Sequence, residues 1–190
     1  SASTKRFIGS VAQVPDRPIR TRQEGHGGRV LVVLAPAVAT YALQQALVAP
    51  ALPDLQRDLG VSPAAAGWVF TSYLLSAAAA TPIGGRLGDI HGKRRVLLWT
   101  LAIVVAATAL AAVAPSLEVL IVARAIQGMG GALFPLSFAL LREHLPPARV
   151  ASGIALVSAL LGVGAAAGVV LAGLVVEALS WQWLFWLPCI

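Results

Sequence analysis

Charged residues and cysteine are scarce in this chain. Asp, Glu, Lys and Arg make up 12% of its 190 residues, against 58% hydrophobic residues, whereas ordinary soluble domains carry roughly 25% charged residues. So few charged residues cannot cover the surface of a water-soluble globule, which excludes an ordinary soluble enzyme. The same composition, apolar and poor in charge, also excludes a disordered protein and a coiled coil. The single cysteine, Cys189, allows neither an intramolecular disulfide nor a cysteine-based zinc site.

Catalytic chemistry has no visible basis in the sequence either. The three histidines, His26, His91 and His144, show no metal-ligand spacing. No glycine-rich stretch follows a strand, as a nucleotide-binding loop would. We therefore predict no enzyme, no metal site and no cofactor.

Long apolar stretches are what the chain has instead. They approach the length of about 20 residues that crosses a bilayer, and short polar breaks separate them. They are too long, too rich in Ala and Leu and too free of alternation to be strands. We predict an all-α integral membrane protein with spans at residues 30–48, 64–83, 96–113, 119–141 and 151–179, and with the start of a sixth near Trp183.

The positive charges predict the orientation of these spans. Six Lys/Arg lie in residues 1–29, four in the break after the second span and two in the break after the fourth, and all these segments face one side. The opposite side holds Arg57 and the acids Asp54, Asp58, Glu118 and Glu177. The positive-inside rule then predicts a cytoplasmic N-terminus in the inner or plasma membrane. Residues 1–29 lack the apolar core of a signal peptide and are predicted to form a flexible tail, with no nucleic-acid partner.

The break after the second span reads GRLGDIHGKRR from residue 85 to residue 95. On its own it is equally consistent with a basic cytoplasmic loop, in which Gly92 permits a turn with positive φ. Its spacing resembles the signature loop of the major facilitator superfamily, G-x-x-x-D-x-x-G-[RK]-[RK]. The residues that match this pattern are Gly85, Asp89, Gly92, Lys93 and Arg94. The resemblance implies that Asp89 and the basic residues latch the two halves of a transporter.

Three further segments resemble the drug:proton antiporters of that superfamily, most closely the fourteen-span branch. Residues 120–132 resemble their second motif, and residues 181–185 resemble a W-R-W-x-F element with Gln182 in place of Arg. Residues 164–173 are similar to the antiporter motif, but Val169 stands where Pro is expected and Ala172 where Gly is expected. Small residues at such spacing mark close helix packing, and the packing glycines we predict are Gly128, Gly164, Gly168 and Gly173.

Arg124 lies within the fourth span, roughly 10 Å below its outer boundary at 1.5 Å per residue. An arginine there costs about 2.5–3.5 kcal/mol on insertion scales, and snorkelling to the interface is one way to meet that cost. Gln44 and Gln45 in the first span lie at a similar depth, and Gln127 follows Arg124 by one turn. We predict that these four residues line a polar cavity for substrate or coupling.

One position departs from the resemblance. Gln44 stands where relatives in this branch commonly carry an Asp, and glutamine cannot titrate. No carboxylate lies deep within any predicted span, so the sequence shows no proton carrier. The proton-coupling group therefore lies outside these residues, or coupling is altered.

The resemblance, from Val30 onwards, implies the N-terminal half of a major facilitator bundle. We expect a secondary transporter that exports small organic or drug-like molecules by alternating access, with coupling to protons in the full-length protein. Its expected partners are the lipid bilayer, a small-molecule substrate, protons and the C-terminal half of the same transporter. A sugar or metabolite importer of the same superfamily is one alternative. A non-transporting membrane fragment or structural membrane subunit is another.

Overall fold

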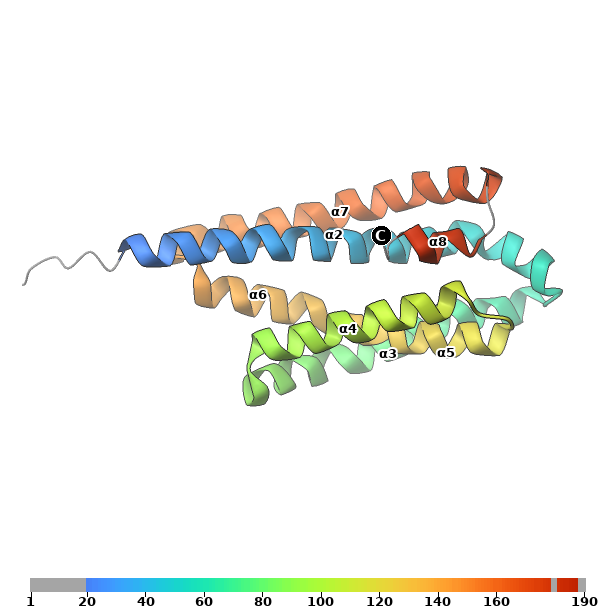
Figure 1. Ribbon diagram of the computed structural model, residues 1–190, viewed down its shortest axis with the longest axis horizontal. Helices are drawn as coiled ribbons and strands as arrows, with labels where there is room; N and C mark the ends of the chain where they lie inside the picture. The colour runs from blue at the N-terminus through green and yellow to red at the C-terminus, as the bar shows by residue number, and fades with distance from the viewer. Residues whose placement is uncertain (1–19, 179–180, 188–190) are drawn as a thin grey trace, which may run out of the picture.

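The computed structural model describes residues 20–178 and 181–187, and these residues form helices and short turns without any strand. The elements are α2 (Arg20–Leu59), α3 (Pro63–His91), α4 (Lys93–Ala112), α5 (Leu117–Gly128), the 3-10 helix η1 (Met129–Ala132), α6 (Leu133–His144), α7 (Pro147–Ala178) and α8 (Trp183–Trp186). The long helices lie side by side, roughly along the long axis of the molecule, which is horizontal in Figure 1.

Five helical stretches are long and apolar enough to cross a membrane. They are Val30–Leu59, Pro63–His91, Lys93–Ala112, Leu117–His144 and Pro147–Val175. Large apolar side chains also cover the outer surface of the bundle: Val32 is 72% exposed, Leu75 62% and Val170 66%. Such a surface is stable in lipid and unfavourable in water. The prediction of an all-α, multi-pass membrane protein is confirmed.

Helix α2 begins at Arg20, inside the segment predicted to be a flexible tail. Adding residues to the end of an existing helix avoids the cost of nucleation, so a short polar extension of an apolar helix can remain helical. The rest of the predicted tail, residues 1–19, lies outside the described residues. The helix also continues through Pro36, Pro50 and Pro53 to Leu59, which neighbouring helices make tolerable in membrane bundles.

Helix α3 has a capped first turn, and a single residue, Gly92, separates its last residue from α4. The first turn of α3 is capped by Ser62, whose hydroxyl accepts a hydrogen bond from Ala65 N at 3.2 Å, and Pro63 follows as the first helical residue. At the other end Gly92 has a φ of 89°, which only glycine adopts readily. Lys93 therefore starts α4 directly after the turn.

The predicted fourth span is not one continuous α-helix. Residues Met129–Ala132 form the 3-10 helix η1 between α5 and α6. Pro135 has no N–H to donate to the carbonyl of Gly131, four residues earlier, so the α-helical ladder is interrupted there. Gly130 and Gly131 add to the interruption, because glycine is a weak helix former.

Close packing between α2 and α7 depends on two of the predicted glycines. A Cβ on Gly164 would lie 2.5 Å from the Ala39 carbonyl oxygen, and one on Gly168 would lie 2.5 Å from the Leu43 carbonyl oxygen. Gly173 was also predicted to be a packing glycine, but no atom lies within 4 Å of the position that its Cβ would take. Five residues of helix turn the side-chain direction by about 140° relative to Gly168, so Gly173 faces away from α2.

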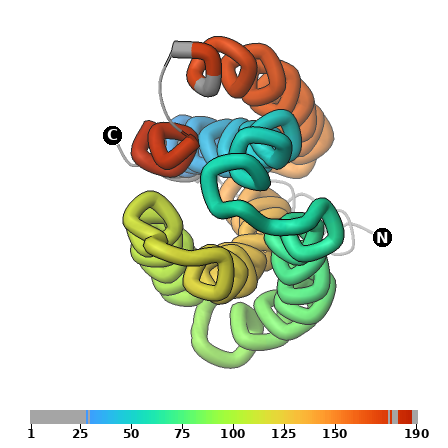
Figure 2. The backbone as a smooth tube through the Cα atoms, turned by 90° about the vertical axis from the view of Figure 1, so that its right-hand side faces the viewer, coloured from blue at the N-terminus to red at the C-terminus, as the bar shows by residue number. Residues whose placement is uncertain are grey.

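Viewed end-on, α2 and α7 form one pair, and α3, α4 and α5–α6 form a second layer (Figure 2). The α3–α4 and α6–α7 turns lie at one end of the bundle, and the α2–α3 and α4–α5 turns lie at the other (Figure 1). We call the first of these the basic end, because its turns are flanked by Arg86, Lys93, Arg94, Arg95, Arg142 and Arg149.

Candidate functional site: a buried polar network around Arg124

The Arg124 side chain on α5 is fully enclosed, with 0% of its surface exposed. Its Nε donates to the Val69 carbonyl oxygen of α3 at 3.3 Å. Its two terminal nitrogens donate to side-chain oxygens, one to Gln127 Oε1 at 2.7 Å and one to Gln45 Oε1 of α2 at 2.9 Å. Three helices therefore hold the guanidinium, and it does not snorkel to the interface.

A chain of neutral polar groups extends from Arg124 to α4. Gln127 Nε2 donates to the Thr108 hydroxyl at 3.0 Å, and Gln44 Nε2 donates to the same oxygen at 2.6 Å. The Thr108 hydroxyl in turn donates to the Val104 carbonyl oxygen at 2.7 Å. Because Thr108 accepts from both amides and donates to its own helix, its hydrogen-bonding capacity is fully used.

Two tyrosines, one on α2 and one on α3, also belong to the network. The hydroxyls of Tyr41 on α2 and Tyr73 on α3 lie 3.0 Å apart. The Arg124 guanidinium carbon lies 4.5 Å from the centre of the Tyr73 ring, which is a cation–π arrangement. The Tyr41 hydroxyl also approaches the Gln127 carbonyl oxygen at 3.5 Å. We refer to Tyr41, Gln44, Gln45, Tyr73, Thr108, Arg124 and Gln127 as the polar network.

No carboxylate takes part in this network. The ion pairs among the described residues are Arg57–Asp54, Lys93–Asp89 and Lys93–Glu143, all near helix ends. A buried charge is costly unless it is paired or hydrogen-bonded. Here three neutral oxygen acceptors and one aromatic ring stabilise the arginine in place of a counter-ion.

The structure brings all four residues predicted for the cavity into one network, but it does not expose all of them to a cavity. A pocket of about 210 Å³ between α2, α4 and α6 is lined by Thr40, Tyr41, Gln44 and Thr108 together with apolar residues. Gln45, Arg124 and Gln127 do not line it. Tyr41, Tyr73 and Thr108 were not among the residues predicted for the site. Tyr41 precedes Gln44 by three residues, and that helical spacing could have revealed it.

The predicted latch residues lie at the basic end, around the α3–α4 turn. Lys93 forms an ion pair with Glu143 near the end of α6, and Asp89 Oδ1 lies 3.9 Å from Lys93 Nζ. The Asp89 side chain is 73% exposed and Arg94 is exposed as well. Gly85 faces open space. Glu143 was missed, although it is an acidic residue in the last turn before the second basic break.

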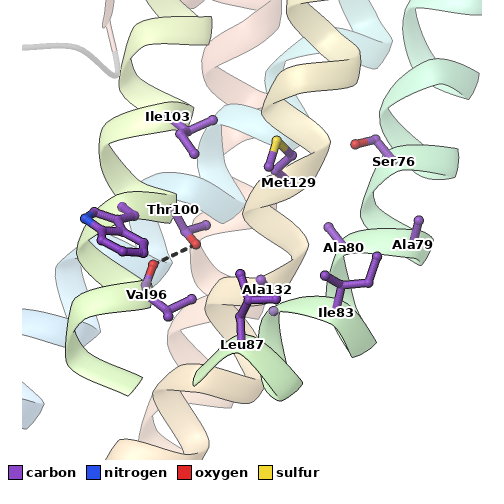
Figure 3. Close-up of a pocket in the computed structure, with 12 residues that line it drawn as sticks. Ser76, Ala79, Ala80, Ile83, Leu87, Val96, Thr100, Ile103, Met129 and Ala132 are labelled. Carbon is purple, nitrogen blue, oxygen red and sulfur yellow. Dashed lines mark hydrogen bonds between the residues drawn. The ribbon is translucent and has the colours of Figure 1, made fainter. Parts of the chain in front are cut away.

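A second pocket, of about 310 Å³, lies between α3, α4 and η1 (Figure 3). Its walls are largely apolar, with Ile83, Leu87, Ile103 and Met129 pointing into it. The Thr100 hydroxyl at its edge is already bonded to the Val96 carbonyl oxygen at 2.9 Å. This pocket suits an apolar chain and offers little to a polar ligand.

These features define the class of the protein: a multi-pass helical membrane protein with an arginine held among neutral polar groups in its core. The chain belongs to the Major Facilitator Superfamily, whose family model matches residues 34–190.

Three relatives show which members of the family it resembles. It is 31% identical over 159 residues to multidrug resistance protein 3 of Bacillus subtilis, covering 83% of this chain and 31% of the relative. It is 33% identical over 177 residues to the tetracenomycin C resistance and export protein of Streptomyces glaucescens, covering 91% and 33%. It is 36% identical over 165 residues to a cephamycin export protein of Amycolatopsis lactamdurans, covering 86% and 34%. The chain thus spans about a third of the length of these relatives.

Proposed function

We propose that this chain is the N-terminal helical half of a secondary transporter that exports small organic molecules by alternating access, with coupling to protons in the full-length protein. The observation that carries this proposal is the polar network, which gathers an arginine, three glutamines, a threonine and two tyrosines in the middle of otherwise apolar helices. Polar and ionisable residues inside a membrane are costly, and such sites commonly mark a transport pathway. Two relatives are named for the export of tetracenomycin C and of cephamycin, which agrees with the proposal.

The basic end faces the cytoplasm in this proposal, with the protein in the inner or plasma membrane. Arginine and lysine are concentrated around the turns at that end, as in cytoplasmic loops generally. In a full-length protein from which Cys189 and every other native cysteine have been removed, Ser10→Cys should react with a membrane-impermeant thiol reagent only in inside-out vesicles. Ser62→Cys should react only in intact cells, and the reverse pattern would overturn the orientation.

Gly85, Asp89, Gly92, Lys93 and Arg94 are proposed to latch this half against the C-terminal half on the cytoplasmic side. The exposure of Asp89 supports this role, because its carboxylate remains available for a further cationic partner. Lys93 is already engaged by Glu143, which supports a role in holding the turn against α6. Asp89→Asn in the full-length transporter should lower the export rate without lowering protein abundance in the membrane.

Gln44, Gln45, Arg124 and Gln127 are proposed to form the part of the substrate or coupling site that this half contributes. The test is antibiotic susceptibility of a sensitive host that expresses the full-length protein, with and without an uncoupler. We expect resistance that the uncoupler removes and that Arg124→Ala abolishes. Arg57→Ala is the matched control, because Arg57 is exposed and, among the described residues, forms an ion pair only with Asp54. Unchanged resistance with Arg124→Ala at equal abundance would refute the role of the network.

A further inference from the structure

The apolar pocket between α3, α4 and η1 is accessible from the surface of the bundle (Figure 3). Three of the large side chains that line it are about half exposed: Ile83 at 56%, Trp99 at 51% and Met129 at 42%. No residue of the polar network lines it. A ligand can therefore enter this pocket, of about 310 Å³, without passing through the polar network.

Small residues create the space. Ala79, Ala80 and Gly84 of α3 and Ala132 of η1 all line the pocket. A Cβ on Gly84 would collide with the Cβ of Ala132, so the backbones of α3 and η1 lie close together there. Small residues on α3 and η1, between larger side chains from α3 and α4, leave a groove with a closed floor. We call it the α3–α4 groove.

The length of the groove matches one leaflet of a bilayer. Leu87 and Val96 line it close to the α3–α4 turn, and Ser76 lines its far end on α3. The eleven residues from Ser76 to Leu87 span about 16 Å at 1.5 Å per residue. The hydrocarbon core of a bilayer is about 30 Å thick, so one leaflet accounts for about 15 Å. The groove therefore covers the acyl-chain region of the leaflet at the basic end.

The end of the groove next to the α3–α4 turn is positively charged. Arg95 precedes Trp99 by four residues, so the two side chains lie on the same face of α4. Arg86 directly precedes the lining residue Leu87, and both arginines are exposed. Asp89, the acid of this turn, lies two residues after Leu87 and points about 160° away from it around α3. The groove therefore ends beside two cations, with the nearby acid on another face.

Trp99 marks the boundary between the apolar and polar parts of the groove. Its ring lies 6.4 Å from the ring of His91, the last residue of α3. Tryptophan is enriched where lipid headgroups meet the hydrocarbon core. The headgroup level therefore falls at the end of the groove where the two arginines lie.

We propose that the α3–α4 groove binds an acidic phospholipid, with one acyl chain along its apolar walls and the phosphate held by Arg86 and Arg95. Arginine suits the second part because its planar guanidinium pairs with phosphate oxygens through two hydrogen bonds. The first part follows from the apolar lining. The site lies apart from the polar network, so the inference does not depend on the proposed transport function.

The two arginines set the size of the expected preference. A basic side chain near a membrane surface favours an acidic lipid about fivefold, the equivalent of about 1 kcal/mol. A zwitterionic lipid with the same chains fills the groove equally well but lacks the net charge. We therefore expect the acidic lipid to be preferred at least fivefold.

Trp99 provides the measurement, because it lines the groove. Phosphatidylglycerol and phosphatidylcholine with the same brominated acyl chains quench a tryptophan that they contact. Each would be mixed in small amounts into phosphatidylcholine vesicles that hold the full-length protein. The Trp99 signal is the difference between the wild type and Trp99→Phe. We expect brominated phosphatidylglycerol to quench it at a mole fraction at least fivefold lower.

Three variants separate the headgroup from the chain. Arg86→Gln combined with Arg95→Gln should remove the preference but keep the quenching by both lipids. Arg149→Gln is the control, because Arg149 is exposed at the basic end but lines a different pocket, together with Leu31 of α2. It should keep the preference. Ala80→Phe fills the groove and should raise the mole fraction that both lipids need.

Three results would overturn the proposal. Equal quenching by the two lipids would mean that the groove does not select a headgroup. A preference that survives loss of Arg86 and Arg95 would mean that these residues do not hold the phosphate. No quenching of Trp99 by either lipid would mean that another part of the full-length protein covers the groove. Each of these results would leave the proposed transport function standing, since antibiotic susceptibility tests that function separately.

Discussion

Gln44 and Gln45 are adjacent on α2, yet their side chains serve different partners. Gln44 donates to Thr108 on α4 at 2.6 Å, and Gln45 accepts from Arg124 on α5 at 2.9 Å. Neighbouring residues on a helix point about 100° apart, so the pair connects α2 to two helices at one level of the membrane. The polar network therefore links α2 to α3, α4 and α5 around a single arginine.

Tyr73 contributes a hydroxyl and a ring, and two substitutions separate them. Tyr73→Phe removes the hydrogen bond to Tyr41 but keeps the ring under Arg124, so we expect a loss of about 0.6 kcal/mol, the average for such bonds in membranes. Tyr73→Leu also removes the cation–π contact and should cost clearly more. Thermal unfolding of the purified full-length protein measures both. Equal losses in the two variants would show that the ring contributes nothing.

Gly168 and Gly173 give a matched test of helix packing on α7. Gly168→Ala places a Cβ 2.5 Å from the Leu43 carbonyl oxygen, a backbone atom that cannot rotate away. We expect the helices to be forced apart, with a lower unfolding temperature and less protein in the membrane. Gly173→Ala meets no atom within 4 Å and should be neutral or slightly stabilising. A loss of stability with Gly173→Ala comparable to that with Gly168→Ala would contradict this packing.

The α3–α4 turn depends on the backbone of Gly92. Gly92→Ala forces a residue with a side chain to a φ of 89°, at a cost of roughly 1–2 kcal/mol. Gly85→Ala, on α3 and in open space, should not destabilise the protein. Unfolding temperatures and protease sensitivity at the basic end measure the difference. Equal behaviour of the two variants would mean that the positive φ is not required.

The Lys93–Glu143 ion pair joins α4 to α6 at the basic end. Because Glu143 is about half exposed, we expect Glu143→Lys to change stability by less than about 1 kcal/mol. We expect export to fall by more than this small change in stability would cause, because the ion pair holds the α3–α4 turn against α6. Glu143→Gln removes the negative charge without adding a positive one, so it should lower export less than Glu143→Lys in the susceptibility assay. Unchanged export with Glu143→Lys at equal protein abundance would argue against a role for this pair.

Some of the site could be predicted from the sequence because depth in a membrane is a function of residue number. At 1.5 Å per residue, Gln44, Gln45 and Arg124 fall at similar levels, and the structure places them in one network. Residue number does not give the rotation of each helix about its axis. For that reason the division of roles between Gln44 and Gln45, and the participation of Tyr73 and Thr108, could not be predicted.

The broad architecture is a property of the sequence alone. Apolar stretches of membrane-spanning length, together with the scarcity of charge, determine an all-helical membrane protein, because a backbone in lipid must satisfy its own hydrogen bonds. The spacing of Gly85, Asp89, Gly92, Lys93 and Arg94 indicated the superfamily, which the family match confirms. The tertiary structure decided how the buried charge is held. Arg124 is enclosed by neutral oxygens from three helices, and only the packing of those helices brings the oxygens within hydrogen-bonding distance.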